Sequence, residues 1–392
     1  MNEKASSFFS LHEDRFARLR SIDWWEQEKL ASAKVLIIGA GALGNEVIKN
    51  LALLGLGHMV IVDMDRVEMS NLSRSVLFRE QDRNCFKAEC AARTAKELFP
   101  GVNIYSIKGN VMCDVGFGFF KWADIVVGAL DNREARVFVN KVCALVSRPW
   151  IDGGIEVLNG IVRGFAPPAT ACYECTMSKI DWEILDKRKS CSLLARHAEL
   201  TGHIPTTATT ASIIGAIQAQ EVIKFIHNKE VLMGRGYVFE GEFHNSFLVN
   251  YSINPKCERH ELPPPIKVIP YFNSDTPLQE ICDYACQYLT GFDAVEFERE
   301  IVHYFTCPNC KKNQLIFLPI VRITPDMLLC DTCNVEYLPS YLHGISAGDV
   351  LLKKTVRQIG LPAWDILWVR YKEDYIGIEL DGDNPFSLKE FK

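Results

Sequence analysis

The sequence lacks a long apolar run. Its hydrophobic stretches are interrupted by Gly, Asp or Lys well before the ~18 residues that a membrane-spanning helix needs. The N-terminal stretch, MNEKASSFFSLHEDRFARLR, is polar and charged and contains no apolar core of a signal peptide. Internal repeats and low-complexity tracts are missing as well. These absences predict a soluble, cytoplasmic protein that has no membrane partner.

An excess of basic residues is also missing. The 392 residues include 43 Lys and Arg against 49 Asp and Glu, which gives a formal net charge of −6. Because nucleic-acid-binding proteins carry clustered basic residues, we expect no nucleic-acid partner. The length and the 48% hydrophobic content are sufficient for two or three domains with packed cores.

Cysteine is abundant, with 14 residues, but its spacing is not that of a disulfide framework. Three pairs have the CxxC spacing, at 172/175, 307/310 and 330/333. In a long chain without a secretion signal, such pairs indicate metal sites rather than disulfides.

The first part of the chain alternates short apolar runs with helical patterns, which predicts an α/β domain over roughly residues 30–165. The run VLII at 35–38 ends in GAGALG, a helical pattern follows, and a second apolar run ends in Asp63. This order is typical of a doubly wound, mainly parallel sheet. The pattern continues with a helix at 86–98, strands at 102–107 and 124–130, and a helix at 133–146.

Further along, residues 206–227 predict a long helix and residues 237–253 a β-hairpin. Five prolines between 255 and 270 mark the clearest domain boundary. We therefore expect three parts: an α/β domain at 1–262, a linker with a cysteine-rich module at 263–340, and a small C-terminal region at 341–392. Within that last region, residues 348–382 predict one helix and short strands.

The glycines of GAGALG have the GxGxxG spacing, directly between a strand and a helix. Gly39 permits a tight turn, Gly41 lets a phosphate approach the backbone, and Gly44 permits close helix packing. Asp63, at the end of the next strand, is placed to accept a hydrogen bond from a ribose. This context predicts a nucleotide site but does not separate NAD from ATP.

Polar residues after the second strand favour ATP. Asn71, Arg74 and Lys87 lie in one loop-and-helix stretch, and two cations suit a triphosphate better than a nicotinamide cofactor. Asp131 and Asn132 follow another apolar strand at the same edge of the sheet, where a carboxylate can hold magnesium. For Asp131 the alternative role is that of a helix N-cap.

These residues together resemble the ubiquitin-activating enzyme family, whose simplest relatives are the MoeB and ThiF adenylyltransferases. The resemblance covers about residues 12–260. The matching motifs are RFAR at 15–18, GAGALG at 39–44, DMD at 63–65, SNLSR at 70–74, Lys87, DN at 131–132, CYEC at 172–175 and IPTT at 204–207.

The resemblance implies a Rossmann-like adenylation domain that uses magnesium-ATP to adenylate the C-terminal carboxylate of a ubiquitin-like protein. By the same resemblance, Asp63 binds the ribose and Asp131 binds magnesium. The phosphates are bound by Asn71, Arg74 and Lys87. Asp65 and Asn132 belong to the same two motifs and complete the expected nucleotide site. Arg18 matches an arginine finger that a second subunit contributes, which implies a homodimer; alternatively, RFAR is part of an ordinary amphipathic helix.

Cys191 lies in a crossover segment, near 176–205, where thioester-forming members of the family carry the catalytic cysteine. Lys187, Arg188 and Lys189 precede it and favour its thiolate form. The alternative is an unreactive surface cysteine, and the 12 residues between Cys191 and Ile204 are more than compact relatives have. Thr206 and Thr207 are expected to cap the next helix rather than assist a thioester step.

Two zinc sites are expected. The family places a second pair of ligands after the hairpin, and there this sequence has Cys257 and His260, which would complete a site with Cys172 and Cys175. A second site has four thiolates and 19 residues between its two pairs, as in a zinc ribbon, and is closed and structural. Its ligands are Cys307, Cys310, Cys330 and Cys333.

The expected fold is thus α/β, with a smaller C-terminal α+β region that contains the zinc ribbon. Residues 341–392 lie where larger activating enzymes carry a ubiquitin-fold domain that recruits the conjugating enzyme. The leading hypothesis is an activating enzyme that captures a ubiquitin-like protein on Cys191 and passes it to a conjugating enzyme. The alternatives are a MoeB- or ThiF-like enzyme for a sulfur carrier, a nicotinamide-dependent oxidoreductase, and a non-catalytic scaffold. Compact enzymes of this kind resemble those of bacterial conjugation operons linked to antiviral defence.

Overall fold

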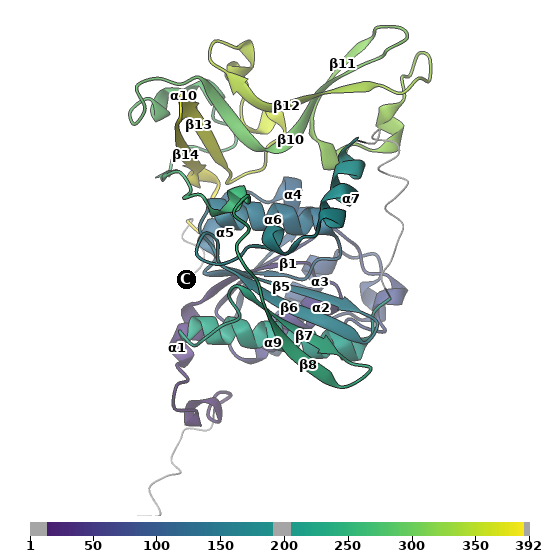
Figure 1. Cartoon of the computed structure of the whole chain (residues 1–392), viewed down its shortest axis with the longest axis vertical. Coiled ribbons are helices and arrows are strands. Elements are labelled where there is room, and N and C mark those ends of the chain that lie inside the picture. The colour runs from purple at the N-terminus through teal and green to yellow at the C-terminus, as the bar shows by residue number, and fades with distance from the viewer. Residues whose placement is uncertain (1–13, 191–204, 388–392) are drawn as a thin grey trace, which may run out of the picture.

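A computed structural model describes residues 14–190 and 205–387, which form two layered units (Figure 1). The larger unit contains an eight-stranded sheet of order β3-β2-β1-β4-β5-β6-β7-β8. The first five strands in this order are parallel and the last three are antiparallel, so the expected mainly parallel sheet is confirmed. The bounds are β1 Lys34–Ile38, β2 His58–Asp63, β3 Asn103–Lys108, β4 Ile125–Gly128, β5 Trp150–Glu156, β6 Asn159–Phe165, β7 Arg235–Glu240 and β8 Asn245–Asn250.

Helices cover both faces of this sheet, which explains why its central strands β1 and β4 are almost wholly apolar and buried. One face packs against α1 (Gln27–Ser32), α2 (Ala42–Leu53), α3 (Lys87–Leu98) and α9 (Ala208–Ile226). The other face packs against α4 (Val111–Asp114), α5 (Phe117–Trp122) and α6 (Arg133–Leu145). Alternate residues of β1 face opposite sides of the sheet. Val35 and Ile37 belong to the core under α2 and α9, and Leu36 and Ile38 belong to the core under α5 and α6.

The second unit is a six-stranded sheet with its own core. The strand order is β11-β10-β13-β14-β9, with β12 also paired to β10. Its elements are β9 Ile266–Ile269, α10 Leu278–Ala285, β10 Ala294–Thr306, β11 Asn313–Pro319, β12 Leu338–Ser346, β13 Ile366–Tyr371 and β14 Asp374–Leu380. This one sheet takes strands from both 263–340 and 341–392, so the division between those two ranges stays a prediction.

The prediction of a helix within residues 348–382 is wrong. The structure has two three-ten turns there, Val350–Lys353 and Arg357–Ile359. Asp349 caps the first turn through the Leu351 N–H, and Gly360, with φ +87°, ends the second. A left-handed residue so soon after the turn prevents the helix from continuing.

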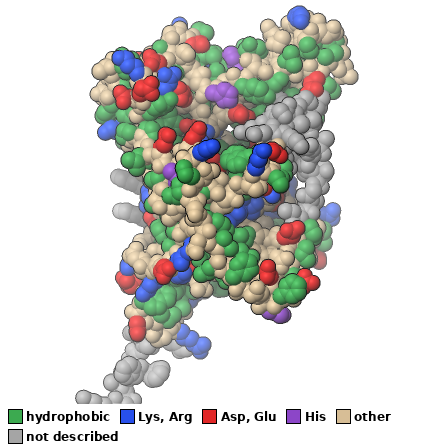
Figure 2. Space-filling view, in the orientation of Figure 1, with side chains coloured by type: hydrophobic (Ala, Val, Ile, Leu, Met, Phe, Trp, Pro, Cys, Tyr) green, Lys and Arg blue, Asp and Glu red, His purple; other side chains and the backbone are tan. Residues whose placement is uncertain are grey.

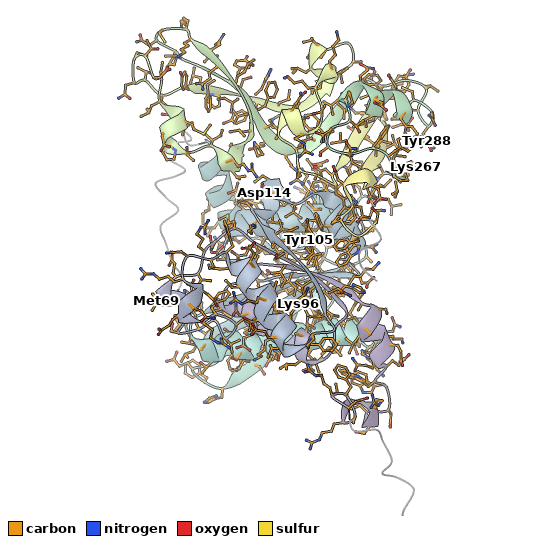
Figure 3. All side chains as sticks on the ribbon, turned by 180° about the vertical axis from the view of Figure 1, so that it is seen from behind. Met69, Lys96, Tyr105, Asp114, Lys267 and Tyr288 are labelled. Atoms are coloured by element: carbon orange, nitrogen blue, oxygen red, sulfur yellow. The ribbon has the colours of Figure 1, made fainter. Side chains whose placement is uncertain are left out.

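The second unit packs directly on the helical layer formed by α4, α5 and α6. Trp364 lies so close to Gly118 that a Cβ there would come within 2.4 Å of the indole nitrogen. Arg299 is buried at the junction and donates to the carbonyls of Met112 and Val115, both at 2.7 Å. Asp114 also lies at this junction (Figure 3), where it pairs with Arg322. The two units therefore share a packed interface.

None of the helices within 14–190 and 205–387 is long and apolar enough to span a bilayer. On the face shown in Figure 2, acidic and basic side chains are interspersed among uncharged ones. This distribution agrees with the small net charge of the sequence.

Candidate functional site

The glycine loop joins β1 to α2 at the carboxyl edge of the large sheet. Gly39 has φ +98°, and a Cβ added there would lie 2.3 Å from the Ala129 carbonyl oxygen. A Cβ on Gly44 would lie 1.9 Å from the Gly39 carbonyl oxygen, whereas one on Gly41 would have no atom within 4 Å. The first and third glycines are therefore required by packing. The second faces open space at the N-terminus of α2, where backbone N–H groups favour an anion.

Asp63 ends β2 and holds the glycine loop. Its carboxylate accepts hydrogen bonds from the backbone N–H groups of Ala40, at 2.7 Å, and Asp65, at 2.8 Å. Burial raises the pKa of Asp63 above its ordinary value, and nearby Lys87 opposes that rise. Each carboxylate oxygen has a second lone pair, so Asp63 can still accept a ribose hydroxyl.

Lys87 is the first residue of α3 and is bound to Asp65 twice. Its Nζ lies 2.8 Å from Asp65 Oδ2, and its backbone N–H donates to the Asp65 carbonyl at 2.9 Å. Arg74 donates to the Ser70 carbonyl at 2.8 Å. Asn71 is buried, and its side-chain oxygen accepts the Glu68 N–H at 3.0 Å. The structure thus shows Asn71 stabilising the turn that carries Arg74.

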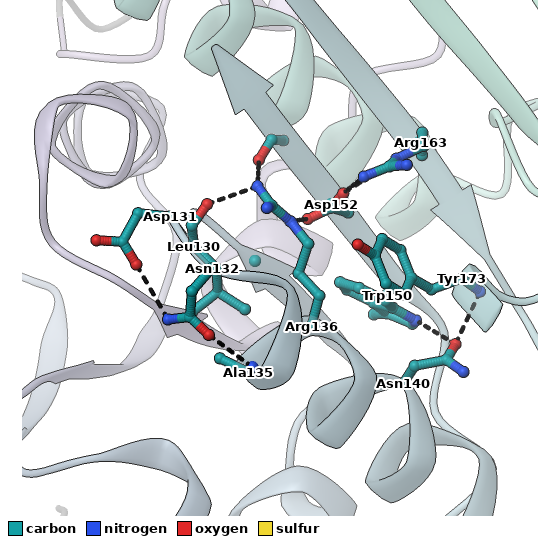
Figure 4. A network of polar contacts seen from close by, with 12 residues as sticks. Leu130, Asp131, Asn132, Ala135, Arg136, Asn140, Trp150, Asp152, Arg163 and Tyr173 are labelled. Atoms are coloured by element: carbon teal, nitrogen blue, oxygen red, sulfur yellow. Dashed lines mark hydrogen bonds and ion pairs between the residues drawn. The ribbon is translucent and has the colours of Figure 1, made fainter. Parts of the chain in front are cut away.

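Asp131 and Asn132 follow β4, which pairs with β1, so they lie at the same sheet edge as the glycine loop. The exposed Asp131 carboxylate accepts the Asn132 side-chain N–H at 3.1 Å (Figure 4). Asn132, not Asp131, caps α6, by accepting the Ala135 N–H at 2.8 Å. The alternative of Asp131 as the cap is therefore wrong, and its carboxylate is available at the surface.

Arg18 lies in a short turn before α1 and is exposed. Its guanidinium makes no ion pair with residues of the described part of the chain. The neighbouring Arg15 donates to the Leu98 carbonyl and lies over the Phe99 ring at 5.4 Å, which attaches this turn to the end of α3. Residues 15–18 form a turn, and a three-ten helix of three residues follows at Leu19–Ser21, so RFAR is not part of an ordinary amphipathic helix.

Cys191 lies outside the described residues, so its role stays a prediction. The helix that leads to it, α7 (Lys179–Ser190), is joined to the start of α6 by an ion pair of 3.1 Å between Arg133 and Asp181. The start of the crossover segment is therefore held against Arg133, which follows Asp131 by two positions in the sequence. Thr207 accepts the Thr210 N–H and caps α9, which confirms its expected capping role.

The first cysteine cluster brings together the four expected ligands. The Sγ atom of Cys172 lies 3.7 Å from that of Cys175 and 3.6 Å from that of Cys257, and Cys175 Sγ lies 3.1 Å from His260 Nε2. Zn–S bonds of about 2.3 Å at tetrahedral angles place sulfurs roughly 3.8 Å apart, so these spacings fit zinc. His260 Nδ1 lies 3.2 Å from the Pro168 carbonyl, which presents Nε2 to the metal.

The second cluster lies at the end of the β10–β11 hairpin and has its own small core. Cys307 and Cys333 Sγ atoms are 3.4 Å apart, and those of Cys310 and Cys330 are 3.6 Å apart. All four ligand atoms of each cluster lie within 4.8 Å of one another. Both groups can hold a zinc ion, and the four thiolates of the second leave no place for a substrate.

Several buried polar residues of the site were missed from the sequence. Asn45, on α2, donates to the Ala40 carbonyl at 2.7 Å and accepts the Leu77 N–H at 2.8 Å, so it joins the loop to the segment after SNLSR. Gln218, on α9, donates to the Gly128 carbonyl at 2.9 Å. A polar residue on the apolar face of the predicted helix at 206–227 was the available signal for Gln218.

A second missed group surrounds Asp152, which is fully buried. Arg136 Nε lies 2.8 Å from Asp152 Oδ1, and Arg163 Nε lies 3.1 Å from Asp152 Oδ2 (Figure 4). Asn140 accepts N–H groups from Tyr173, at 3.0 Å, and Trp150, at 3.4 Å. These bonds join α6 to β5, β6 and Tyr173, behind the turn that carries Asp131.

The sequence matches the model of the ThiF family over residues 13–263. The SAMP-activating enzyme E1 of Haloferax volcanii is 32% identical over 238 residues, which cover 59% of this chain and 81% of that protein. SUMO-activating enzyme subunit uba-2 of Caenorhabditis elegans is 38% identical over 154 residues, 39% of this chain and 26% of that protein. The chain spans about a quarter of the length of the SUMO- and ubiquitin-activating relatives that it matches.

Among solved structures, the chain is similar to E. coli MccB crystallised with ATP. The TM-score is 0.53 with 26% identity, over 64% of this chain and 75% of that one. MccB has also been crystallised with MccA. Because the family match covers most of the chain and includes the glycine loop, the DN motif and the first cysteine cluster, this protein belongs to the ThiF family.

Proposed function

We propose that this chain adenylates the C-terminus of a ubiquitin-like protein with ATP. The observation that carries the proposal is the convergence of the Gly41 opening, Asp63, Lys87 and Asp131 at one edge of the sheet. The relatives support it, because they are named as enzymes that activate SUMO, NEDD8 and SAMP proteins. The oxidoreductase alternative has no comparable support.

In the proposed reaction, a carboxylate oxygen of the partner attacks the α-phosphorus of ATP. The bond from that phosphorus to the oxygen leading to the β-phosphate breaks, and pyrophosphate leaves with the bonding electrons. Positioning of the weak carboxylate nucleophile and neutralisation of the phosphate charge supply the acceleration, so no general base is needed. Asp63 would bind the ribose, and Lys87 and Arg74 would bind phosphate oxygens.

Magnesium fits this site because Asp131 presents an exposed carboxylate beside the glycine loop. When bound, the ion would neutralise charge on the phosphates. To bind a phosphate oxygen, the Lys87 ammonium must either leave its 2.8 Å contact with Asp65 or donate to both groups at once. Arg18 would complete the site from a second subunit, which makes the proposed enzyme a homodimer.

In the second step the Cys191 thiolate attacks the carbonyl carbon of the acyl adenylate, and AMP leaves. The thioester would then pass to the cysteine of a conjugating enzyme. Support comes from the ion pair between Arg133 and Asp181, which holds the start of the crossover segment close to the DN motif. The alternative is an enzyme of the MoeB or ThiF kind, which stops at the adenylate of a sulfur carrier.

A non-reducing gel tests both steps. The full chain is incubated with magnesium-ATP and a ubiquitin-like protein encoded near its gene, with and without dithiothreitol. We expect an ATP-dependent, thiol-sensitive band that is lost in Cys191→Ala and kept in Cys286→Ala, which changes a half-buried cysteine of the second unit. Pyrophosphate release by both variants without any band supports the sulfur-carrier alternative. Partner binding without pyrophosphate release contradicts the proposal.

A further inference from the structure

We infer that Arg136 is a positioning residue that orients Asp131 toward the magnesium of bound nucleotide. The inference rests on the proposed function and extends it to a residue that does not itself reach the nucleotide. Arg136 lies one helical turn after the Asn132 cap, and its side chain is only 12% exposed. Its guanidinium points back from α6 toward Leu130, just before the DN motif, and toward Asp152 (Figure 4).

One guanidinium connects the turn before α6 to strand β5. Arg136 donates to the Leu130 carbonyl at 2.5 Å and to the Gly153 carbonyl at 3.0 Å, while its Nε donates to Asp152 at 2.8 Å. Leu130 is the residue directly before Asp131. The chain on the other side of Asp131 is fixed by the Asn132 cap. Asp131 is therefore an exposed carboxylate on a backbone that is held at both neighbours.

The acceptor that orients Arg136 is itself held. Asp152 is fully buried and shared with Arg163, which lies on the neighbouring strand β6 and donates through Nε and Nη2. Two cations face one carboxylate, so this buried group carries a net positive charge behind the DN motif. A planar guanidinium fork is required here, because the single ammonium of Lys cannot make three bonds in these directions.

The chain offers a matched control in Arg148. Its Nε and Nη2 donate to the Lys121 carbonyl, at 3.0 and 2.7 Å, so it too is a partly buried arginine that ties backbone segments together. Arg148 precedes β5 and therefore lies at the opposite edge of the sheet from the DN motif. Arg148→Lys makes the same substitution at another partly buried arginine that donates to backbone, without touching Asp131.

Calorimetric titration of the full chain with a non-hydrolysable ATP analogue, over a range of Mg²⁺ concentrations and in EDTA, tests the role. Loss of groups that orient a metal ligand typically weakens metal binding 10–100-fold. Arg136→Lys should raise about 10-fold the Mg²⁺ concentration at which half of the Mg²⁺-dependent gain in analogue affinity is reached. The affinity measured in EDTA should stay within about twofold of the wild-type value. Arg148→Lys should change neither quantity by more than about twofold, because its fork lies away from Asp131.

A double-mutant cycle separates positioning from a merely structural role. Asp131→Asn should raise the Mg²⁺ requirement, and adding Arg136→Lys to it should raise that requirement no further. The inference would be overturned if Arg136→Lys weakened analogue binding equally with and without Mg²⁺. It would also be overturned if the increases in Mg²⁺ requirement caused by the two substitutions multiplied in the double variant. If Arg136→Lys does not fold, Arg163→Lys, which leaves both backbone bonds of Arg136 intact, should give a smaller shift of the same kind.

Failure of the proposed function gives a different result. In that case the wild-type chain binds the analogue neither with Mg²⁺ nor in EDTA, and both proposals fall together. If the wild type binds the analogue with Mg²⁺ and Arg136→Lys leaves the Mg²⁺ dependence unchanged, only the positioning role of Arg136 is contradicted.

Discussion

Replacement of single glycines in the loop after β1 should separate nucleotide binding from folding. Gly41 has φ −72° and ψ −160°, an extended conformation that Ala adopts freely, and its Cβ would meet no atom within 4 Å. Gly→Ala stabilises by about 0.4–1 kcal/mol through the unfolded chain. Ala is a poorer N-cap than Gly, by up to about 1 kcal/mol. Because these effects oppose each other, Gly41→Ala should change the free energy of unfolding by less than about 1 kcal/mol.

Nucleotide binding should respond differently. The open space beside Gly41 is where a phosphate would meet the backbone N–H groups of α2, and a methyl group would occupy it. Losing even one charge-assisted hydrogen bond of about 1.5–3 kcal/mol corresponds to roughly 10-fold or more in affinity. We therefore expect Gly41→Ala to be folded like the wild type and to bind ATP at least about 10-fold more weakly.

Gly44→Ala provides the contrast. Its Cβ would lie 1.9 Å from the Gly39 carbonyl oxygen, and real Cβ contacts are not found below 3.0 Å, so α2 must move away from the loop. Overpacking of this kind costs typically 1–3 kcal/mol. Circular dichroism during urea unfolding and calorimetry with magnesium-ATP measure the two effects. Undiminished ATP binding by Gly41→Ala, or a Gly44→Ala protein as stable as the wild type, would refute the reasoning.

Three other predictions concern the metal sites, the junction and pH. Elemental analysis of the purified chain should find two zinc ions. Cys310→Ser should remove one of them and leave ATP binding unchanged, because the ribbon lies in the second unit. Loss of both ions in this variant would contradict two separate sites. Arg299→Met leaves Asp365 buried without its cationic partner and should lower the free energy of unfolding by about 3–5 kcal/mol in urea titrations. A loss below about 1 kcal/mol would contradict a buried ion pair. Burial raises the pKa of Asp63, so its charge costs stability at neutral pH and that cost disappears as the pH falls through the raised pKa. The stability of Asp63→Asn relative to the wild type should therefore decrease on acidification, and a difference that is constant between pH 4 and 8 would show that burial does not raise this pKa.

The nucleotide edge could be predicted because its signals are local. Gly39 and Gly44 fall at fixed distances between a strand and a helix, and parallel strands bring Asp63 and Asp131 to one edge of the sheet. The pairing of Cys172 with Cys257 across the chain came from the family resemblance, not from spacing. The four ligands do lie together in the structure.

The buried residues that support the nucleotide edge of the large sheet could not be predicted. Asp152 lies in an apolar strand, and its partners Arg136 and Arg163 are separated from it by 16 and 11 residues, in elements whose register no local pattern sets. The helix expected after Gly348 was wrong for a related reason, because Gly360 and contacts with the second core limit it to short turns. Tertiary contacts decided both cases.

Exchange of labelled pyrophosphate into ATP tests the central claim most directly, because it reports formation of the acyl adenylate itself. The full chain is assayed with a ubiquitin-like protein that binds it, with the same protein carrying a C-terminal amide, and with Lys87→Ala. We expect exchange that requires the free carboxylate and falls at least about 10-fold in Lys87→Ala, since Lys87 would hold a phosphate. Exchange that is equal with the amidated partner, or absent although the partner is bound, would contradict C-terminal adenylation.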